Sequence, residues 1–397
     1  MPMSQTMPFS LTAEALEAAD AEDDPGSLAA ATRLRARFGP ELAAAAASQV
    51  ELRRLARAKF GDMANRMFFT RGGLEQASRP EVADYHAHRL AAEGVRRVVD
   101  FGCGIGADAM AFARAGLKVI AVELDPTTAA AATANLVGMA EVVCADAEVV
   151  AEQLLRTSDG VFCDPARRTS SGRVWRVEDF TPAWSFVLRL LDRIQPAAVK
   201  LGPALPHRLI PADVDAEWVS HRGDTVEVCL WGGPTSSGVR SAMILPDHRL
   251  VVPSQLPRLP VSDPKGYIYE PDGAVIRAGG IAMLGDSLNA ALLDPSIAYL
   301  TSDQLTPTPY GTAFAIERVL PYDLKGMRSW VREADIGILE IKKRGLDVDP
   351  AQLRRQLRPS GPASATLILT RMPDGAKAIV AKRLGPGTPG GRVLMSD

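Results

Sequence analysis

The sequence predicts an α/β protein whose centre is a mostly parallel sheet with helices on both faces. Strand and helix signals alternate from Val95 to about Gly233, and a glycine-rich turn within 98–125 joins a short apolar strand to a helix and a second strand. Such alternation is typical of a parallel sheet. A proline-rich stretch then separates this region from a tail with a different pattern. We therefore expect four segments: an N-terminal helical region (1–94), a central domain (95–233), a linker (234–264) and a small C-terminal α+β domain (265–397).

The N-terminal region has the composition of helices. Residues 28–38 and 41–60 are rich in Ala, Leu, Arg and Glu, and the second run places its large apolar side chains near one side. Ser78 is the predicted N-cap of a helix over 80–90, with Pro80 in its first turn. We expect this helix to pack against the edge of the sheet and to cover the glycine-rich turn, where such folds bind a nucleotide.

The central domain is predicted to hold five crossover-linked strands and a terminal β-hairpin. Arg222, Gly223 and Asp224 separate the last two apolar runs, and so short a connection indicates a hairpin. This order is more specific than a plain dinucleotide fold. The predicted strands cover residues 97–100, 118–122, 140–144, 160–163, 197–201, 217–221 and 226–231.

The C-terminal region alternates strands and helices within about 80 residues, which is typical of a compact α+β module. Apolar runs predict its strands, and amphipathic patterns predict its helices. The predicted strands are 267–269, 313–319, 336–342 and 365–369, and the predicted helices are 324–333 and 350–357.

Composition describes an ordinary globular protein. Of 397 residues, 47% are hydrophobic and 23% are charged, and the net charge of −2 gives no overall attraction to nucleic acid or acidic membranes. The charge is uneven, because residues 321–397 hold 14 Lys and Arg against 8 Asp and Glu, a surplus of 6. This basic tail suits an anion, although surface lysines commonly serve only solubility.

The sequence shows no targeting signal and no metal motif. It opens without a basic and apolar signal-peptide pattern, and no run approaches the roughly 20 apolar residues of a membrane span. The four cysteines lie apart within apolar runs, so we expect buried thiols in a reducing cytoplasm. The histidines lack metal-ligand spacing, and His86 and His88 point to opposite sides of one helix. We expect a cytoplasmic protein with no membrane contact and no metal.

The glycine-rich turn fits two kinds of nucleotide. Gly102, Gly104, Ala107 and Glu123 match the pattern of a nicotinamide dinucleotide fold. Asp100, directly before the turn, would repel a pyrophosphate and would attract an ammonium group. The acids that follow the third and fourth predicted strands lie where such sheets bind ligands. These acids favour a cationic ligand and leave a nicotinamide-dependent oxidoreductase as the alternative.

The motifs DFGCGIGAD, VELD, CADA and CDPARR resemble those of class I S-adenosylmethionine-dependent methyltransferases, over roughly 95–233. The segments KFGDMANRMFFTRGGLEQASRP, GDTVEVCLWGG, PYDLKGMRSWVREADIGILEIKKRG and ATLILTR are similar to a bacterial family of methyltransferase-like proteins with a C-terminal THUMP-like domain. The resemblance implies a Rossmann-like methyltransferase sheet, S-adenosylmethionine as cofactor and a methyltransferase activity. THUMP domains proper bind structured RNA, so RNA is the expected partner.

The resemblance also implies cofactor-binding residues. Asp100 would lie near the ammonium group, and Glu123 would bind both ribose hydroxyls because a carboxylate accepts two of them at once. Asp146 would bind the adenine amino group. Gln76 would touch the cofactor from above, with a purely structural turn as the alternative. The glycines that would let the backbone approach the cofactor are Gly102, Gly104 and Gly106.

The acceptor side departs from the known motifs. Base-modifying relatives carry D/N-P-P-aromatic, whereas Asp164 and Pro165 are followed here by Ala166 and Arg167. Uracil methyltransferases with D-P-P-R use a separate cysteine nucleophile, and Cys163 is expected to point into the core. We therefore expect catalytic roles for Asp164, Pro165 and Arg167, with Asp164 as proton acceptor or orienting group for an amine.

Basic residues are the candidates for binding the substrate. Those after Asp164 alternate with aromatic residues and suit a phosphate and a stacked base, or else form a surface loop with nearby acids. Three more in the C-terminal region follow an apolar strand and suit a phosphate backbone or a solvated turn. The altered motif also leaves open a catalytically idle nucleic-acid-binding protein. The candidates are Arg168, Arg173, Lys200, Lys342, Lys343 and Arg344.

Overall fold

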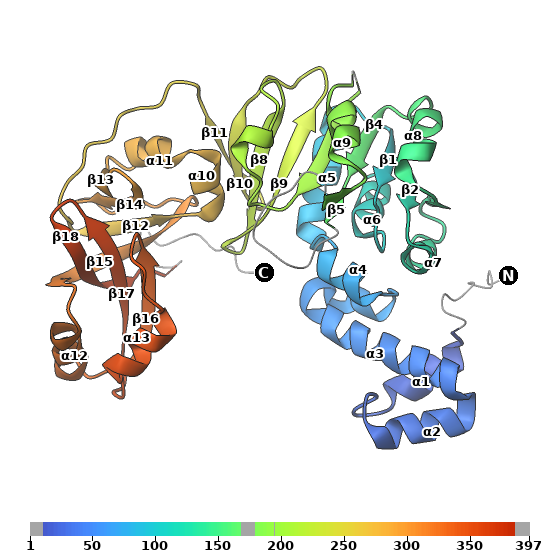
Figure 1. Cartoon of the computed structure of the whole chain (residues 1–397), viewed down its shortest axis with the longest axis horizontal. Coiled ribbons are helices and arrows are strands. Elements are labelled where there is room, and N and C mark those ends of the chain that lie inside the picture. Colours follow the sequence, from blue (N-terminus) through green and yellow to red (C-terminus); the bar gives the residue numbers. More distant parts are fainter. Residues whose placement is uncertain (1–10, 168–178, 194, 386–397) are drawn as a thin grey trace. The chain divides into compact units, whose positions relative to one another are not determined.

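Figure 1 shows the computed structural model of the chain, which alternates helices and strands and contains two large sheets. The structure describes residues 11–167, 179–193 and 195–385. Helices and strands follow one another through the centre of the chain, so the predicted α/β class is confirmed.

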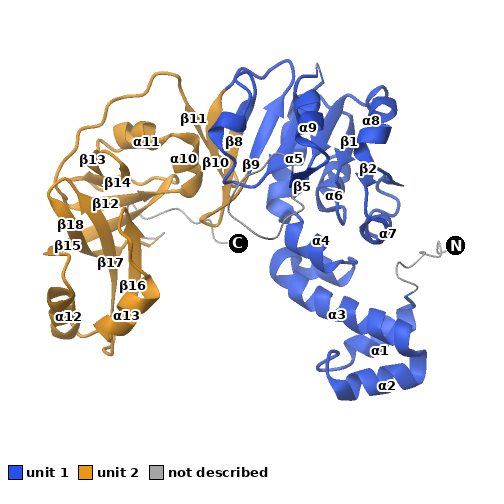
Figure 2. Ribbon diagram, viewed as in Figure 1, with its two compact units in different colours: residues 1–216, 228–238 blue, residues 217–227, 239–397 orange. Residues whose placement is uncertain are grey.

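The chain divides into two compact units, coloured blue and orange in Figure 2. The first unit consists of Met1–Ala216 and Val228–Gly238, and the second of Glu217–Glu227 and Val239–Asp397. The division thus falls within the predicted hairpin. We therefore describe each unit by itself.

The first unit begins with helices. Residues 28–38 were expected to form one helix, and α2 has these bounds. A short 3-10 helix, η2 (Gly61–Asn65), follows the longest of them. The helices before the first strand are α1 (Ala13–Asp20), α2 (Leu28–Phe38), α3 (Pro40–Phe60), α4 (Arg71–Gln76) and α5 (Pro80–Ala92).

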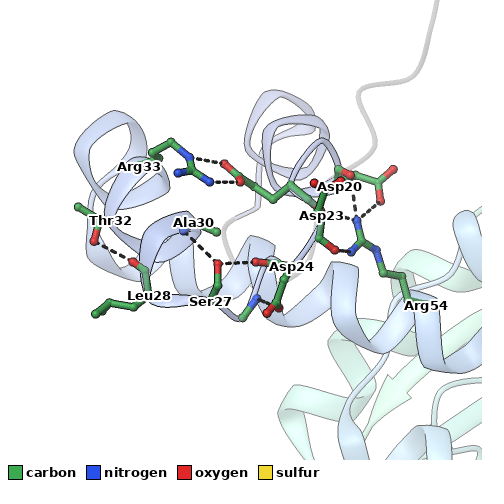
Figure 3. A network of polar contacts seen from close by, with 11 residues as sticks. Asp20, Asp23, Asp24, Ser27, Leu28, Ala30, Thr32, Arg33 and Arg54 are labelled. Carbon is green, nitrogen blue, oxygen red and sulfur yellow. Dashed lines mark hydrogen bonds and ion pairs between the residues drawn. The ribbon is translucent and has the colours of Figure 1, made fainter.

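Arg54, in α3, binds the turn between α1 and α2 through its guanidinium group (Figure 3). It forms an ion pair with the carboxylate of Asp20 at 3.6 Å. Its guanidinium donates hydrogen bonds of 2.8–3.0 Å to three backbone carbonyls, those of Asp20, Glu22 and Asp23. Carbonyls at the end of a helix lack partners within it, so Arg54 stabilises this turn.

Five parallel strands form the centre of the first unit, in the order β7-β4-β1-β2-β3. Because they are parallel, their carboxyl ends lie at one edge of the sheet, where ligands bind in such folds. All five lie at the predicted places. They are β1 (Arg97–Phe101), β2 (Lys118–Glu123), β3 (Glu141–Cys144), β4 (Gly160–Cys163) and β7 (Ala197–Leu201).

Further elements of the first unit connect these strands. A two-stranded antiparallel pair, β5 and β6, follows the end of β4. A 3-10 helix, η4 (His207–Leu209), follows β7. The connecting elements are α6 (Ala107–Arg114), α7 (Pro126–Asn135), α8 (Ala147–Leu155), β5 (Ala166–Arg167), β6 (Phe180–Thr181) and α9 (Trp184–Leu191).

The predicted hairpin is formed by β8 (Asp215–His221) and β9 (Asp224–Gly232). Arg222 and Gly223, between them, adopt φ of 52° and 90°. Such left-handed conformations are typical of two-residue hairpin turns. β9 runs antiparallel to β7, and the full sheet has the order β11-β10-β8-β9-β7-β4-β1-β2-β3.

The segment expected as a linker contains regular structure. β10 (Arg240–Ile244) and β11 (His248–Val252) form an antiparallel pair within residues 234–264. Prolines are abundant in this segment, but only Pro246 falls between the paired strands, where a ladder bond is not needed. Proline density therefore concealed a second hairpin.

The second unit is built on a seven-stranded sheet with the order β13-β14-β12-β15-β18-β17-β16. Its strands are β12 (Tyr267–Pro271), β13 (Ala291–Asp294), β14 (Ile297–Ser302), β15 (Gly311–Pro321), β16 (Ile336–Arg344), β17 (Ala363–Met372) and β18 (Gly375–Arg383). Its helices are α10 (Gly273–Ala278), α11 (Ile281–Ser287), α12 (Leu324–Glu333) and α13 (Pro350–Leu357), of which the last two have the predicted bounds.

Side chains from both sides of this sheet are buried in separate clusters. One cluster joins Trp330 of α12 and Leu353 of α13 to alternate strand residues such as Leu367. The other contains Tyr299 and Phe314 and no residue of α12 or α13. Because side chains alternate across a strand, each cluster covers one face.

None of the helices in the described ranges is long and apolar enough to cross a membrane. The four cysteines are free thiols. Cys103, Cys163 and Cys229 are buried as expected, whereas Cys144 is exposed at the end of β3, so the expectation was wrong for that residue.

Candidate functional site

The glycine-rich turn after β1 requires glycine for two reasons. Gly102, Gly104 and Gly106 adopt φ of 75°, 57° and 87°, which residues with a Cβ rarely adopt. A Cβ on Gly102 would lie 2.7 Å from the backbone oxygen of Asp164. A Cβ on Gly104 would meet no atom within 4 Å. The turn therefore lets the end of β4 approach closely and leaves open space beside Gly104.

Asp100 is a buried carboxyl beside the glycine-rich turn. Its exposed fraction is 0%, and neither oxygen has a hydrogen-bond partner among the described residues. Burial is the largest cause that raises the pKa of Asp100 well above its usual value, followed by the nearby carboxylates of Asp108 and Asp164. Since buried polar groups are normally hydrogen-bonded, this position fits a cationic donor such as the ammonium group of S-adenosylmethionine.

Glu123 is held at the end of β2 by two backbone N–H groups. Gly104 donates to Oε2 and Asp125 donates to Oε1, each at 2.9 Å. Burial raises the pKa of Glu123, while these hydrogen bonds act to lower it. A carboxylate has about four acceptor sites, so both oxygens can still accept hydroxyl groups of a ribose.

Asp146 lies one strand further along the same edge. It is the N-cap of α8, where its Oδ1 accepts a hydrogen bond from the backbone N–H of Glu148 at 2.9 Å. Asp146 is exposed. Glu123, the last residue of β2, pairs in register with Cys144, the last residue of β3, so Glu123 and Asp146 lie at the ends of neighbouring strands.

Residues 67–79, here called the strap, run from η2 to α5 and are held by side-chain amides. Gln49 of α3 donates to the backbone oxygen of Phe69 at 2.6 Å and accepts from its N–H at 3.0 Å. Asn135 of α7 contacts Phe68 in the same way, at 2.9 and 2.7 Å. The strap is thus tied to two helices of the first unit.

The strap also contacts the glycine-rich turn. Asn135 donates to the backbone oxygen of Ile105 at 2.9 Å, and a Cβ on Gly73 would lie 2.4 Å from the Ile105 side chain. Lys59 of α3 donates to two carbonyls at the end of α4, each at 2.7 Å. Gln76, the predicted cofactor contact, is the last residue of α4 and is exposed. The sequence predicted that the helix over 80–90, which is α5, covers the nucleotide site; in the structure the strap contacts Ile105 of the glycine-rich turn.

The predicted catalytic residues follow β4. The backbone N–H of Asp164 donates to Phe101 at 3.0 Å, and its side chain is 28% exposed. Pro165 is buried, and Arg167 belongs to β5. Burial raises the pKa of the Cys163 thiol well above its usual value, which disfavours a thiolate nucleophile there. Arg168 and Arg173, predicted to bind substrate, lie outside the described residues.

Lys200 lies beside Asp164 because β4 and β7 pair in register at Cys163 and Val199. It is 9% exposed, and its ammonium group forms an ion pair with the Asp164 carboxylate. It also donates to the Ser78 hydroxyl at 2.9 Å. The residue predicted to contact substrate therefore contacts the predicted catalytic carboxylate.

Ser78, Asp108 and His86 continue this network into the first unit. Ser78 donates to Asp108 at 2.7 Å, and His86 Nδ1 lies 2.9 Å from the other oxygen of Asp108. Burial alone would raise the pKa of Asp108, but Lys200, His86 and Ser78 outweigh it and lower the pKa to about 2. Asp108 is therefore ionised.

The prediction that Ser78 caps α5 was wrong. The N-cap is Arg79, directly before Pro80, and no side chain caps the helix there. Proline at the first helical position already implied this assignment. The signal for Asp108 was a single acid within the apolar helix ADAMAFAR, and none of the sequence patterns pointed to His86 as its partner.

The basic residues of β16 are largely paired within the second unit. Lys342 forms an ion pair with Glu270 of β12 at 2.6 Å, and Arg344 lies 3.8 Å from the same carboxylate. Arg383 of β18 pairs with Glu340 at 2.6 Å. Lys343 is exposed and takes part in none of these ion pairs.

In the described ranges, no group of three or more His, Cys, Asp or Glu side chains is arranged to hold a metal ion. Lys200, Asp108 and Asp164 are instead paired with one another, whereas Asp100 has no hydrogen-bond partner among the described residues.

Two family profiles match the chain. One, described as a methyltransferase domain, matches residues 99–164, which include the glycine-rich turn and Asp164. The other, described as THUMP domain-like, matches residues 311–383 in the second unit.

Similar proteins include two from Mycobacterium tuberculosis, strains CDC 1551 and H37Rv, each described as an uncharacterized S-adenosylmethionine-dependent methyltransferase. Each is 32% identical over 358 residues, covering 86% of this chain and 96% of the relative. A solved structure described as a methyltransferase from Porphyromonas gingivalis W83 has a TM-score of 0.74 at 21% identity, covering 94% of this chain and 98% of that chain. This last likeness shows the fold.

Proposed function

Because the chain belongs to a family of S-adenosylmethionine-dependent methyltransferases, we propose that it transfers the methyl group to RNA. One observation carries this proposal: a methyltransferase domain and a THUMP-like region occur in the same chain. The THUMP-like region would position the RNA, and the first unit would carry out the transfer. The nicotinamide hypothesis is not retained, since the cofactor of this family is S-adenosylmethionine.

The first unit offers each part of the cofactor a suitable group. Asp100 is the counter-ion for the ammonium group, because it is buried, carboxylic and without another partner in the part of the chain that the structure describes. Glu123 binds the ribose hydroxyls, and Asp146 binds the adenine. The open space beside Gly104 accommodates the cofactor against the backbone. Gln76 contacts the cofactor from the strap.

When bound, S-adenosylmethionine supplies a methyl group on a positively charged sulfur. The residues of the chain need to hold the acceptor atom in line with that group and to exclude water. The Lys200 ammonium stabilises the charged form of the Asp164 carboxylate. Asp164 is therefore better suited to orient an amine through a hydrogen bond than to remove its proton. Pro165 and Arg167 shape the same edge.

The second unit offers basic side chains for the RNA backbone. Lys343 of β16 is exposed, as are Arg355 of α13 and Arg358, which directly follows that helix. Exposed cations bind phosphates by releasing counterions, so such binding weakens steeply with salt. Lys342 and Arg344 are held by Glu270 and contribute mainly to the local potential.

Incubation of the purified chain with labelled S-adenosylmethionine and total cellular RNA tests the proposal. Label should enter RNA, and Asp164→Ala should reduce the rate without abolishing cofactor binding. Mass spectrometry of nucleosides from a deletion strain should then show one missing methylated nucleoside, which names the acceptor atom. Incorporation into proteins or metabolites with none into RNA would overturn the RNA assignment.

A further inference from the structure

Lys200 connects the proposed methyl-donor site, which consists of Asp100, Glu123 and Asp146, to the strap and α6. Its ammonium group contacts groups from three separate elements: Asp164 after β4, Ser78 in the strap, and Asp108 of α6 at 3.9 Å. A lysine has three donors on a flexible stem. With 9% exposure and polar groups on several sides, this lysine has little freedom to move.

The groups behind Lys200 fix its position. Ser78 accepts from Lys200 and donates to Asp108, so its hydroxyl is used in both directions. The second oxygen of Asp108 is held by His86 of α5, which is 0% exposed and packs its ring 5.1 Å from that of Phe162. The chain of contacts therefore runs from a packed aromatic core to the Asp164 carboxylate.

The pairing of serine with lysine is not a nucleophilic dyad. A catalytic serine needs an accessible oxygen and a neutral base, whereas Ser78 is 6% exposed and already donates to Asp108. Lys200 contacts two carboxylates, which keep it charged. Ser78 and Lys200 consequently have a geometric role.

We propose that Lys200 is a positioning residue for methyl transfer: Ser78 and Asp108 hold its ammonium group, which in turn fixes the Asp164 carboxylate at the acceptor side of the donor site. This inference rests on the proposed role of Asp164 in the transfer. It makes the strap and α5 part of the machinery, because they supply Ser78 and His86.

Steady-state kinetics with the RNA that accepts the methyl group test the proposal. Lys200→Met should lower kcat by about 10- to 100-fold, because misplacement of a positioned group by about 1 Å can cost about 100-fold in rate. The dissociation constant for S-adenosylmethionine, from calorimetry, should change less than about threefold, since Lys200 contacts none of the proposed cofactor residues directly. Lys200→Arg should restore part of kcat, and Ser78→Thr should retain more of it than Ser78→Ala.

The matched control is Lys118→Met, because Lys118 is exposed at the amino end of β2. It should leave kcat and cofactor affinity at wild-type values. Wild-type kcat in Lys200→Met would overturn the proposal, as would equal losses of kcat and of cofactor affinity, which would indicate general disruption.

A second measurement does not depend on the acceptor. Hydrogen exchange of peptides that cover residues 74–86 should accelerate in Lys200→Met and stay unchanged in Lys118→Met. If the wild type methylates no RNA, the proposed function fails, while the exchange data still test the network. Unchanged exchange in Lys200→Met would overturn the positioning role in either case.

Discussion

The two units contain charged clusters of opposite surplus. In the first unit the carboxylates of Asp108 and Asp164 contact the ammonium of Lys200, and the buried carboxyl of Asp100 lies close enough to feel all three charges. On the sheet of the second unit, three cations (Lys342, Arg344 and Arg383) face two carboxylates (Glu270 and Glu340). The first cluster is complementary to a cationic cofactor, and the second to a polyanion. Charges of both signs are present in each, so it is the surplus that indicates the ligand.

The largest effect is expected from Asp108→Asn. The pKa of Asp108 is lowered to about 2 in the folded chain, against about 3.9 for an unperturbed aspartate. Its stabilisation is therefore present above about pH 4 and is lost as the pH falls toward 2. Removing the charge at pH 7 should cost about 3 kcal/mol of unfolding free energy, because Lys200 and His86 lose their buried partner.

Urea unfolding followed by tryptophan fluorescence measures this loss. Asp84→Asn is the matched control, because Asp84 forms an exposed pair with Arg114 at 2.8 Å, and such pairs contribute about 1 kcal/mol or less. Equal losses in the two variants would contradict a special role for the buried carboxylate.

Asp100→Asn should weaken the binding of S-adenosylmethionine. The amide keeps the shape but removes the counter-ion of the ammonium group, which corresponds to about 1.5–3 kcal/mol, or roughly 10- to 100-fold in affinity. Stability without cofactor should not fall, because Asp100 has no hydrogen-bond partner to lose within the described chain. Calorimetry measures both effects, with Glu141→Gln at the opposite end of the sheet as control. Undiminished affinity would remove Asp100 from the site.

Cofactor binding should also release a proton. Burial raises the pKa of Asp100 well above its usual value, so the free protein holds this carboxyl protonated at a higher pH than usual. A cation beside it favours the ionised form. Affinity for S-adenosylmethionine should therefore rise with pH through the range in which Asp100 titrates. The binding enthalpy should depend on the ionisation enthalpy of the buffer in the wild type and not in Asp100→Asn.

The smallest effect is expected in the second unit. Lys343→Met should weaken RNA binding about two- to threefold and reduce the salt dependence by about one phosphate contact. Lys342→Met should lower affinity by a similar factor while also loosening Glu270, its partner at 2.6 Å. Glu270→Gln should strengthen binding, because it enlarges the positive surplus. Filter binding at two salt concentrations measures all three, and weaker binding of Glu270→Gln would break the comparison.

Much of the fold was predictable from sequence because it is encoded locally. The parallel strands are short apolar runs that end in glycine or an acid, and α12 and α13 have clear amphipathic periods. The family and its cofactor, predicted from the motifs around Gly102 and Glu123, are confirmed. β10, β11, β13, β14 and β18 were not predicted. β10 and β11 lie within the proline-rich stretch that was expected as a linker, and Lys377 and Lys382 interrupt the apolar pattern of β18.

The sequence could propose site residues only at strand ends, and their roles stay predictions. Asp100 and Glu123 lie at the carboxyl ends of β1 and β2, Asp146 and Asp164 follow β3 and β4, and parallel topology brings such positions together. The contact between His86 and Asp108 joins two helices that are distant in sequence, so no hydrophobic or polar period of either helix predicts it. The sequence placed Lys200 at the carboxyl edge of the sheet, where β7 ends. Whether its ammonium group contacts a substrate or Asp164 depends on distances between strands, which the sequence does not give.

The strap also shows how side chains can satisfy the backbone N–H and C=O groups of an extended segment that does not pair with a strand. Gln49 and Asn135 each donate to and accept from one backbone residue, as a peptide group of a paired strand would. Among side chains only the carboxamide has this combination of an NH₂ donor and a carbonyl acceptor in one plane. Two amides thus imitate two peptide units of an absent partner. An acid at either position would be as large and as polar, yet it would present two acceptors to a backbone that needs one of each.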